Sequence, residues 1–275
     1  MSAERQTTGP EPGEQGFDSE TIVRGPREWN ADAYHRVSNT QAAWGNEVLE
    51  RLPLENDETV LDAGCGSGRV TLELADRLPR GRMIAVDGSA DMVRKAREVL
   101  PERCEVFQAD LAELELGRQV DAVFWNAVFH WLSDHDRLYA RLYAALRPGG
   151  RLTAQCGGEG NVASLRRAVE DAAAAKPFRA QLDGWRPPWN FTSAEATSDR
   201  LERAGFTAVR CWLEHKTVEP EDPRSFLATV SLGLHLDRLP ADQHDAFVDA
   251  VLERQPEPLT LEYVRLNIDA RKGDR

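Results

Sequence analysis

The sequence between residues 58 and 156 repeatedly alternates short apolar runs with longer amphipathic stretches. Apolar runs separated by about 10–15 residues of helical period are typical of βαβ units. Such units place parallel strands in one sheet and bury both of its faces under helices. The fold class we expect is therefore α/β, with a doubly wound, mostly parallel sheet. The expected strands are 59–63, 83–87, 105–107, 121–125 and 151–155, and the expected helices are about 69–79, 90–100, 135–146 and 161–175.

Three regions of the chain differ in composition. Residues 1–24 are polar with few apolar side chains, so they cannot offset the entropy of ordering and are expected to form a disordered tail. Residues 25–160 hold the α/β core, whose first helix has an apolar period that stops at Pro53. Residues 161–275 show a looser pattern, which predicts the end of the sheet and a helical cap in the same structural unit. The elements expected there are helices at 193–204, about 223–234 and 241–254, and strands at 208–213 and 262–268.

The charge of the chain and its cysteine and histidine spacing disfavour several classes of function. With 34 Lys and Arg against 46 Asp and Glu, the formal net charge is −12, which argues against nucleic acid or anionic membranes as partners. No apolar stretch approaches the roughly 18 residues that span a bilayer, and the N-terminus has no apolar signal segment, so we expect a cytoplasmic protein. The four cysteines form no C-x-x-C pair and the six histidines no H-x-x-x-H pair, so we expect reduced thiols and no metal.

A glycine-rich turn follows the first expected strand. Gly64, Gly66 and Gly68 stand at alternate positions, where they let the backbone turn sharply and approach a ligand closely at a helix N-terminus. Asp87 ends the second expected strand, 19 residues after Gly68, where a carboxylate can accept both hydroxyls of a ribose. Together these features predict an adenosine-type cofactor at the carboxyl edge of the sheet.

The glycine spacing favours S-adenosylmethionine over NAD as that cofactor. The dinucleotide fingerprint is G-x-G-x-x-G, whereas this chain has G-x-G-x-G preceded by Asp62. A carboxylate beside the loop would repel a pyrophosphate but suits the amino group of a methionine moiety. A nicotinamide-dependent oxidoreductase therefore remains only the less favoured alternative.

The cofactor segment resembles a known family. Residues 60–68 resemble motif I of the class I S-adenosylmethionine-dependent methyltransferases, Asp87 resembles their ribose-binding acid, and 108–111 resemble their adenine-binding segment. The resemblance covers residues 40–160 approximately and implies a Rossmann-like fold. It implies that Asp110 hydrogen-bonds the adenine amino group beside the Leu111 backbone, and that Met92 either packs near the base or belongs to the helix core. The cofactor contacts it implies are Tyr34, Asp62, Gly64, Cys65, Gly66, Gly68, Asp87, Gly88, Met92, Asp110, Leu111 and Asn126.

Two further segments narrow the resemblance. Residues 34–41 resemble the Y-x-x-x-S-x-x-Q segment of the juvenile hormone acid methyltransferases, and residues 125–135 resemble a run found in the trans-aconitate methyltransferases, with Trp125 in place of a small residue. The resemblance implies that Gln41 and Trp131 orient a substrate carboxylate with neutral N–H donors. A carboxylate needs no general base, because it is already an anion. His130 either serves the structure of its loop or acts as a base for another kind of acceptor.

The expected function is therefore methyl transfer to the carboxylate of a small organic acid. The alternatives are O-, N- or C-methylation of another small metabolite with His130 as base, and a protein that binds S-adenosylmethionine without chemistry. The position of Gln41 ahead of the sheet also suggests that the first helix closes over the cofactor as a lid. Substrate contacts are expected from Trp185, Arg186 and Trp189 in a proline-bearing loop, and further aromatic candidates for the pocket are Phe191, Trp212, Phe226 and Tyr263.

Overall fold

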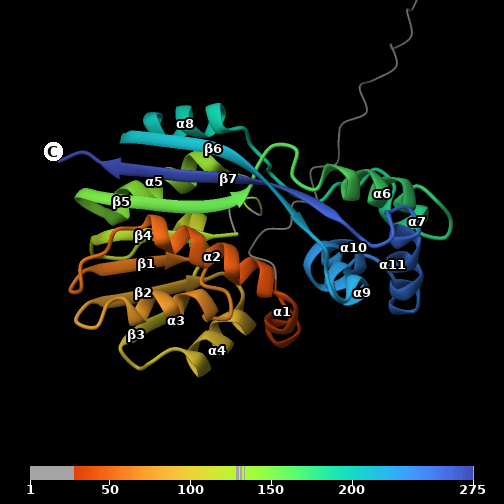
Figure 1. The fold of residues 1–275 in the computed structure, drawn as a ribbon, viewed down its shortest axis with the longest axis horizontal. Coiled ribbons are helices and arrows are strands. Elements are labelled where there is room, and N and C mark those ends of the chain that lie inside the picture. Colours follow the sequence, from red (N-terminus) through yellow and green to blue (C-terminus); the bar gives the residue numbers. More distant parts are fainter. Residues whose placement is uncertain (1–27, 128–129, 131, 133, 275) are drawn as a thin grey trace, which may run out of the picture.

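The computed structural model describes residues 28–127, 130, 132 and 134–274, and the expected tail at 1–24 and Trp131 lie outside that part of the chain. The strands it contains are β1 (Thr59–Ala63), β2 (Arg82–Asp87), β3 (Cys104–Gln108), β4 (Val120–Asn126), β5 (Leu146–Gly157), β6 (Phe206–Val218) and β7 (Leu261–Lys272). They form one sheet in the order β3-β2-β1-β4-β5-β7-β6 (Figure 1). β1 to β5 are parallel, and β7 is antiparallel to both of its neighbours. The predicted α/β class with a mostly parallel sheet is confirmed.

Helices cover both faces of this sheet. The helices of the core are α1 (Ala31–Val37), α2 (Asn39–Arg51), α3 (Arg69–Asp76), α4 (Ala90–Val99), the short 3-10 turn η2 (Leu111–Glu113), α5 (His135–Ala145) and α8 (Ala194–Arg203). Along the central strands, alternate side chains enter opposite layers. Val60 and Phe124 pack with α2, α3 and α4, whereas Leu61 and Trp125 pack with α5 and α8.

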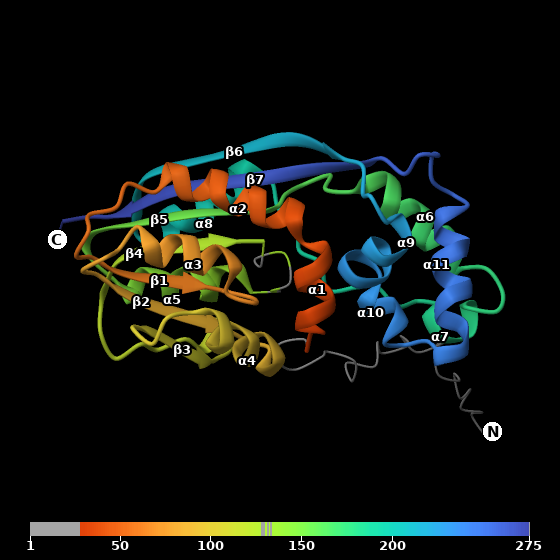
Figure 2. The ribbon, with the colours of Figure 1, turned by 60° about the horizontal axis from the view of Figure 1, so that its bottom comes forward.

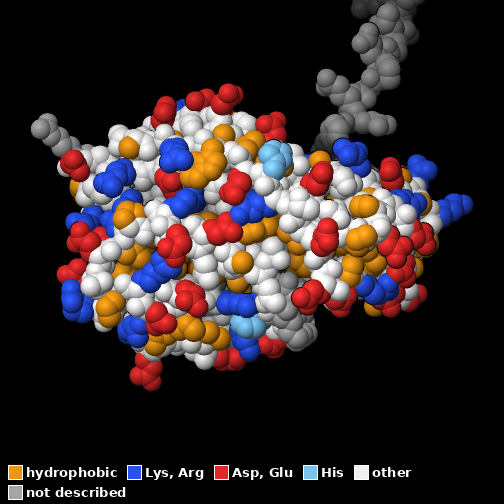
Figure 3. All heavy atoms as spheres, in the orientation of Figure 1, with side chains coloured by type: hydrophobic (Ala, Val, Ile, Leu, Met, Phe, Trp, Pro, Cys, Tyr) orange, Lys and Arg blue, Asp and Glu red, His pale blue; other side chains and the backbone are white. Residues whose placement is uncertain are grey.

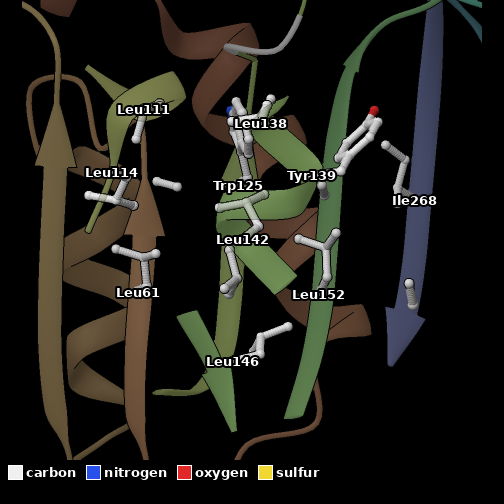
Figure 4. Packing of buried hydrophobic residues seen from close by; sticks show 14 of the residues in the cluster. Leu61, Leu111, Leu114, Trp125, Leu138, Tyr139, Leu142, Leu146, Leu152 and Ile268 are labelled. Atoms are coloured by element: carbon white, nitrogen blue, oxygen red, sulfur yellow. The ribbon is translucent and has the colours of Figure 1, made fainter. Parts of the chain in front are cut away.

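Trp125 belongs to the second of these layers. It is fully buried in β4 and lies beside Leu138 and Leu142 of α5 (Figure 4). The tryptophan that replaces a small residue in the family pattern therefore fills the hydrophobic core.

The remaining helices form a cap with its own apolar cluster. They are α6 (Ala163–Ala173), α7 (Arg179–Leu182), α9 (Pro223–Phe226), the π-helical turn η4 (Leu227–Ser231), α10 (Gly233–Leu236), the 3-10 turn η5 (Ala241–Gln243) and α11 (His244–Leu252). Their buried side chains include Phe178, Phe226 and Phe247, and the same cluster takes in Trp44 of α2 and Tyr263 of β7. The long strands β6 and β7 run from the sheet toward this cap (Figures 1 and 2).

Several element boundaries differ from those predicted. β5, β6 and β7 are all longer than expected, because polar side chains on these strands interrupted the apolar pattern while the antiparallel ladder between β6 and β7 continues. The helix expected at 69–79 ends at Asp76. The single helix expected at 223–234 is instead α9, η4 and α10 in succession.

Two observations bear on the surface. Within the described residues, no helix combines the length and the apolarity that crossing a membrane requires. Acidic and basic side chains intermix over the face shown in Figure 3, so the excess acidic charge is spread over that face.

Candidate active site

The loop after β1 holds three glycines in a left-handed backbone conformation. Gly64, Gly66 and Gly68 have φ of 97°, 53° and 82°, a region that residues with a Cβ rarely adopt. The N–H groups of Gly64 and Cys65 donate to the carbonyl of Val86 at 2.7 and 3.0 Å, which fastens the loop to β2. No atom lies within 4 Å of a Cβ built on Gly66. The loop therefore leaves open space for a ligand above this residue.

Asp87 ends β2 directly beside this loop. Its carboxylate accepts the N–H groups of Gly66 and Ser89, each at 2.9 Å. Burial raises the pKa of Asp87, and the backbone donors Ser89 and Gly66 oppose that rise. Gln108 of β3 pairs with Asp87 in register, and its side-chain amide donates to the Gly88 carbonyl at 2.8 Å. The predicted ribose acid and the predicted adenine segment thus lie side by side.

The other predicted adenine contacts lie around the same edge. The Asp110 carboxylate accepts the Ala112 N–H at 2.9 Å and begins η2. Leu111 and Met92 are both buried, each 4% exposed. The Met92 N–H donates to Ser89 Oγ at 3.3 Å, which caps α4. The burial of Met92 agrees with either of the roles that the sequence left open.

Asp62 lies beneath the glycine loop and is almost completely buried. The Thr71 hydroxyl donates to its carboxylate at 2.7 Å. Burial raises the pKa of Asp62 to about 7; the Thr71 hydrogen bond opposes that rise and the Asp87 charge adds to it. Burial also raises the pKa of the Cys65 thiol well above its ordinary value, so this side chain is neutral. Two carboxylates flanking the loop suit a cationic ligand and disfavour a pyrophosphate.

The segment before α2 docks on the same edge of the sheet. The Trp29 N–H donates to Ser89 Oγ at 3.3 Å, and the Ala31 N–H donates to the Asp91 carboxylate at 2.8 Å. α1 contacts both α4 and η4, so it lies between the core and the cap (Figure 2). Tyr34 of α1 packs edge-on against Trp29, with ring centroids 5.4 Å apart. The lid stays a prediction, but its helix stands where closure would cover the glycine loop.

A cavity of about 70 Å³ lies between the glycine-loop side of the core and the cap. That volume is small beside the roughly 300–1,000 Å³ of sites for drug-sized ligands. No acidic residue lines it within the described part of the chain. Its lining comprises Trp29, Tyr34, Gln41, Trp44, Ala127, His130, Asn161, Val162, Leu165, Trp189, Phe191, Val230, Ser231, Tyr263 and Arg265.

Two of the lining residues have a strained backbone. Ala127 and Val162 have φ of 66° and 44°, in the left-handed region that residues with a Cβ avoid. The only other described non-glycine residue of this kind is Ala208, at the irregularity in β6. Strain of this kind costs about 1–3 kcal/mol and is concentrated at functional sites. The backbone geometry therefore independently indicates that this cavity is functional.

Gln41 and Asn126 join the glycine-loop side to this cavity. The Asn126 side-chain amide donates to the Gln41 carbonyl at 3.0 Å, and Gln41 itself is 7% exposed. The side-chain oxygens of both residues are buried and have no hydrogen-bond partner in the described chain. Buried acceptors without partners are costly unless a ligand satisfies them. With the open space at Gly66 and the two flanking carboxylates, they fit a ligand that carries an ammonium group.

His130 lines the cavity and is half-buried. Its Nδ1 accepts the Gly157 N–H at 3.4 Å, and its ring stacks on Phe191 with centroids 5.4 Å apart. Burial, together with the positive charge of Arg265, lowers the pKa of His130 to about 3. The ring is therefore neutral, and the bond to Nδ1 assigns its proton to Nε2. This arrangement suits a hydrogen-bond donor better than a general base.

Arg265 is the site residue that the sequence analysis did not identify. It projects from β7 beside Tyr263, is 3% exposed, and its Nε donates to the Gln155 side chain at 3.1 Å. Its guanidinium lies 4.8 Å from the centre of the Trp44 ring. Burial lowers the pKa of Arg265, although an arginine remains charged at neutral pH. The available signal was the strand 262–268, in which Arg265 shares one face with Tyr263.

The predicted substrate contacts divide between the cavity and the surface. Trp189 lines the cavity, as do Phe191 and Tyr263. Trp185 packs on His235 inside the cap, with centroids 5.0 Å apart, and Arg186 is exposed and donates to the Trp185 carbonyl. Trp185 and Arg186 are thus not among the cavity's lining residues, and the arginine that does line it is Arg265. The remaining aromatic candidates lie elsewhere, Phe226 in the cap cluster and Trp212 between Arg51 and Arg210 on β6.

Among the residues that the structure describes, no group of three or more His, Cys, Asp or Glu side chains is placed to hold a metal ion. The site residues that do come together are the glycine loop, the two carboxylates and the uncharged polar groups around Gln41.

Comparison with known proteins agrees with this site. Residues 60–150 match the family model described as a methyltransferase domain. Trans-aconitate 2-methyltransferase of Azoarcus sp. (strain BH72) is 38% identical over 225 residues, 81% of this chain and 87% of that protein. The enzyme of the same name from Deinococcus radiodurans is 34% identical over 181 residues, 66% of this chain and 67% of its own.

Solved structures share the fold at low identity. Phosphoethanolamine N-methyltransferase 2 of Haemonchus contortus, in complex with S-adenosyl-L-methionine, has a TM-score of 0.57 at 18% identity, covering 88% of this chain and 56% of that one. The YcgJ protein of Bacillus subtilis has a TM-score of 0.58 at 16% identity, covering 84% and 98%. With its glycine loop and flanking carboxylates, this chain belongs to the family of S-adenosylmethionine-dependent methyltransferases that includes the trans-aconitate 2-methyltransferases.

Proposed function

We propose that this protein O-methylates the carboxylate of a small organic acid. The observation that carries the proposal is the lining of the cavity: among the described residues it contains an arginine and several uncharged polar side chains but no acidic residue, although the net charge of the chain is −12. Such a lining suits an anion. The relatives named trans-aconitate 2-methyltransferase act, by that name, on the anion of an organic acid.

The reaction places few demands on the protein. When bound, S-adenosylmethionine supplies a methyl group on a positively charged sulfur: a carboxylate oxygen bonds to the methyl carbon, the carbon–sulfur bond breaks with its electron pair passing to sulfur, and no proton moves. The chain therefore has to bind both reactants, orient the carboxylate toward the methyl group and exclude water. Gln41 stands between the Asn126 end of β4 and the cavity, where its amide can orient a carboxylate without neutralising it. The indole of Trp131 remains the predicted second donor.

The proposal is tested by the release of S-adenosylhomocysteine from S-adenosylmethionine in the presence of pooled carboxylic acids, phenols or amines. We expect turnover confined to the acids, with methyl esters identified by mass spectrometry. Turnover confined to phenols or amines would reject the carboxylate proposal, and binding of the cofactor with no turnover on any pool would favour a non-catalytic role.

A first prediction concerns Gln41. Gln41→Glu should lower kcat/KM for the acid about 10- to 100-fold, because the added carboxylate repels the substrate and removes a donor. The change is isosteric, so the affinity for S-adenosylhomocysteine, measured by calorimetry, should change less than the affinity for the acid. Asn39→Asp places the same charge on the exposed part of α2 and serves as the control. Equal effects of the two variants would show that Gln41 does not belong to the substrate site.

A second prediction concerns His130. Because its pKa is lowered to about 3, the imidazole stays neutral at pH 6–9. At saturating cofactor and acid, kcat should therefore show no inflection near pH 6.5, and His130→Gln, which can still donate a hydrogen bond, should lower kcat by about 10-fold or less. A limb with an apparent pKa of 6–7 that disappears in His130→Gln would instead establish His130 as a general base.

A further inference from the structure

We propose that Arg265 binds a second, non-reacting carboxylate of the acceptor and thereby determines which acids the protein methylates. This inference rests on the proposed function and deepens it. It assigns Arg265 as a specificity-determining residue that acts at a distance from the methyl-accepting oxygen.

The first observation is a buried positive charge without a counter-ion. Arg265 is 3% exposed, and its Nη2 is buried without a hydrogen-bond partner. In the described chain no carboxylate lies within 4.0 Å of its guanidinium nitrogens. The acid that faces it across the strands, Glu214, is engaged by Lys216 at 3.4 Å and by the Asn267 amide at 3.2 Å. Burying an unpaired charge is costly, so an anionic ligand at this position would be bound strongly.

The second observation is that the guanidinium is held in place before any ligand arrives. Gln155 accepts from Arg265 Nε at 3.1 Å and donates to Asn267 at 2.9 Å. Trp44 lies against the guanidinium, with 4.8 Å between the guanidinium carbon and the ring centre. Arg265 lines the cavity, so a guanidinium fixed in this way is preorganised to bind a carboxylate there.

The third observation is the distance from the cofactor loop. In the sheet, β7 is separated from β1 by β4 and β5. Neighbouring strands lie about 4.8 Å apart, so β7 is on the order of 14 Å from the strand that carries the glycine loop. Gln41 and Asn126 lie between these two strands, because Asn126 ends β4, two strands from β7, and Trp44, one turn after Gln41 on α2, packs on the Arg265 guanidinium. A methyl-accepting carboxylate near Gln41 therefore leaves Arg265 for another carboxylate of the same molecule.

The chemistry requires the same separation. A carboxylate paired with a guanidinium is a poorer nucleophile, because the positive charge stabilises its lone pairs. Neutral donors orient the reacting oxygen without lowering its nucleophilicity. Arg265 is therefore better suited to bind the carboxylate at the other end of the acceptor. After one transfer, a second would place the uncharged ester against Arg265, which disfavours formation of the diester.

The test compares Arg265→Met and Arg265→Lys with the unaltered protein. The substrates are a linear dicarboxylic acid, a tricarboxylic acid and the monocarboxylic acid of the same chain length. We expect the unaltered protein to prefer the multivalent acids by on the order of 100-fold in kcat/KM. Arg265→Met should erase that preference, lowering kcat/KM for the multivalent acids while the value for the monoacid changes by about threefold or less. Arg265→Lys should keep part of the preference, and the diester fraction should rise in Arg265→Met.

Two further measurements keep this test independent. Calorimetry of the dicarboxylate against the S-adenosylhomocysteine complex should show binding that Arg265→Met abolishes, and this readout holds even if the unaltered protein esterifies no acid and the proposed function fails. The melting temperature of Arg265→Met should be unchanged or higher, because an unpaired buried charge is removed. Equal losses for monoacid and diacid, or unchanged dicarboxylate binding in Arg265→Met, would overturn the assignment.

Discussion

Replacing Asp62 by asparagine is expected to stabilise the free protein at pH 8 while weakening its binding of S-adenosylmethionine about 100-fold. The pKa of Asp62 is raised from its ordinary 3.8 to about 7 by burial beneath the glycine loop. The folded protein therefore holds a proton on Asp62 between these pH values that the unfolded chain has lost. Stability consequently falls as the pH rises through this window, and the full cost, about 4 kcal/mol, is present above pH 7.

The asparagine removes the ionisation but keeps an oxygen for the Thr71 hydroxyl. We expect a gain of about 2 kcal/mol at pH 8, because the buried amide has its own desolvation cost. That gain corresponds to a melting temperature higher by roughly 4–8 °C. At pH 4 the gain should vanish, since Asp62 is then protonated in the folded protein.

Binding should respond in the opposite direction. The ammonium group of the cofactor needs the ionised carboxylate, so the affinity of the unaltered protein should rise between pH 6 and 8, and that of Asp62→Asn should be low with less dependence on pH. Calorimetry at pH 6 and 8 measures the affinity for the cofactor, and thermal melts at pH 4 and 8 measure the stability. Asp76→Asn, at the end of α3 with an exposed side chain, is the control and should change neither quantity appreciably. An Asp62→Asn variant that is less stable at pH 8 would contradict the assigned protonation.

The residues that the sequence predicted for the cofactor half of the site lie together at one edge of the sheet. The loop 62–68, Asp87 and the segment 108–111 each directly follow or end a strand, and parallel strands in register bring their ends to one edge. Local patterns therefore sufficed to place them. The strand boundaries were poorest for β5, β6 and β7, and the long antiparallel ladder of β6 and β7 carries polar side chains on a face that the cap and α2 partly cover.

The acceptor half depends on contacts between distant segments. Tyr263 and Arg265 share one face of β7, and an alternating strand at the end of a chain ordinarily turns its polar face to water. Here that face is buried, because Trp44 and the cap cover it. Nothing local distinguishes such an arginine from a solvated one. For the same reason Arg186, which stands in an aromatic loop, was predicted from the sequence as a substrate contact and yet lies exposed.

The last prediction compares truncation of a buried aromatic side chain in the cap with truncation of one in the α/β core. Phe247 is fully buried in the cap cluster, packed against Phe178 with ring centroids 5.0 Å apart. Trp125 is fully buried in the core, one residue before Asn126. Truncating either to alanine should lower the free energy of unfolding by about 3–5 kcal/mol, because each leaves a large cavity. Denaturant titration measures both losses.

The functional consequences of the two truncations should differ. In Phe247→Ala, under conditions where the protein remains folded, affinity for S-adenosylhomocysteine should stay within about threefold, because the glycine loop, Asp62 and Asp87 all lie in the core. Binding and turnover of the acid should fall at least about 10-fold, because Trp44 and Tyr263 of the cavity pack in the cap cluster. Trp125→Ala should weaken both ligands, since β4 positions Asn126 between the two halves. Equal loss of cofactor affinity in both variants would show that packing in the cap also supports the cofactor site.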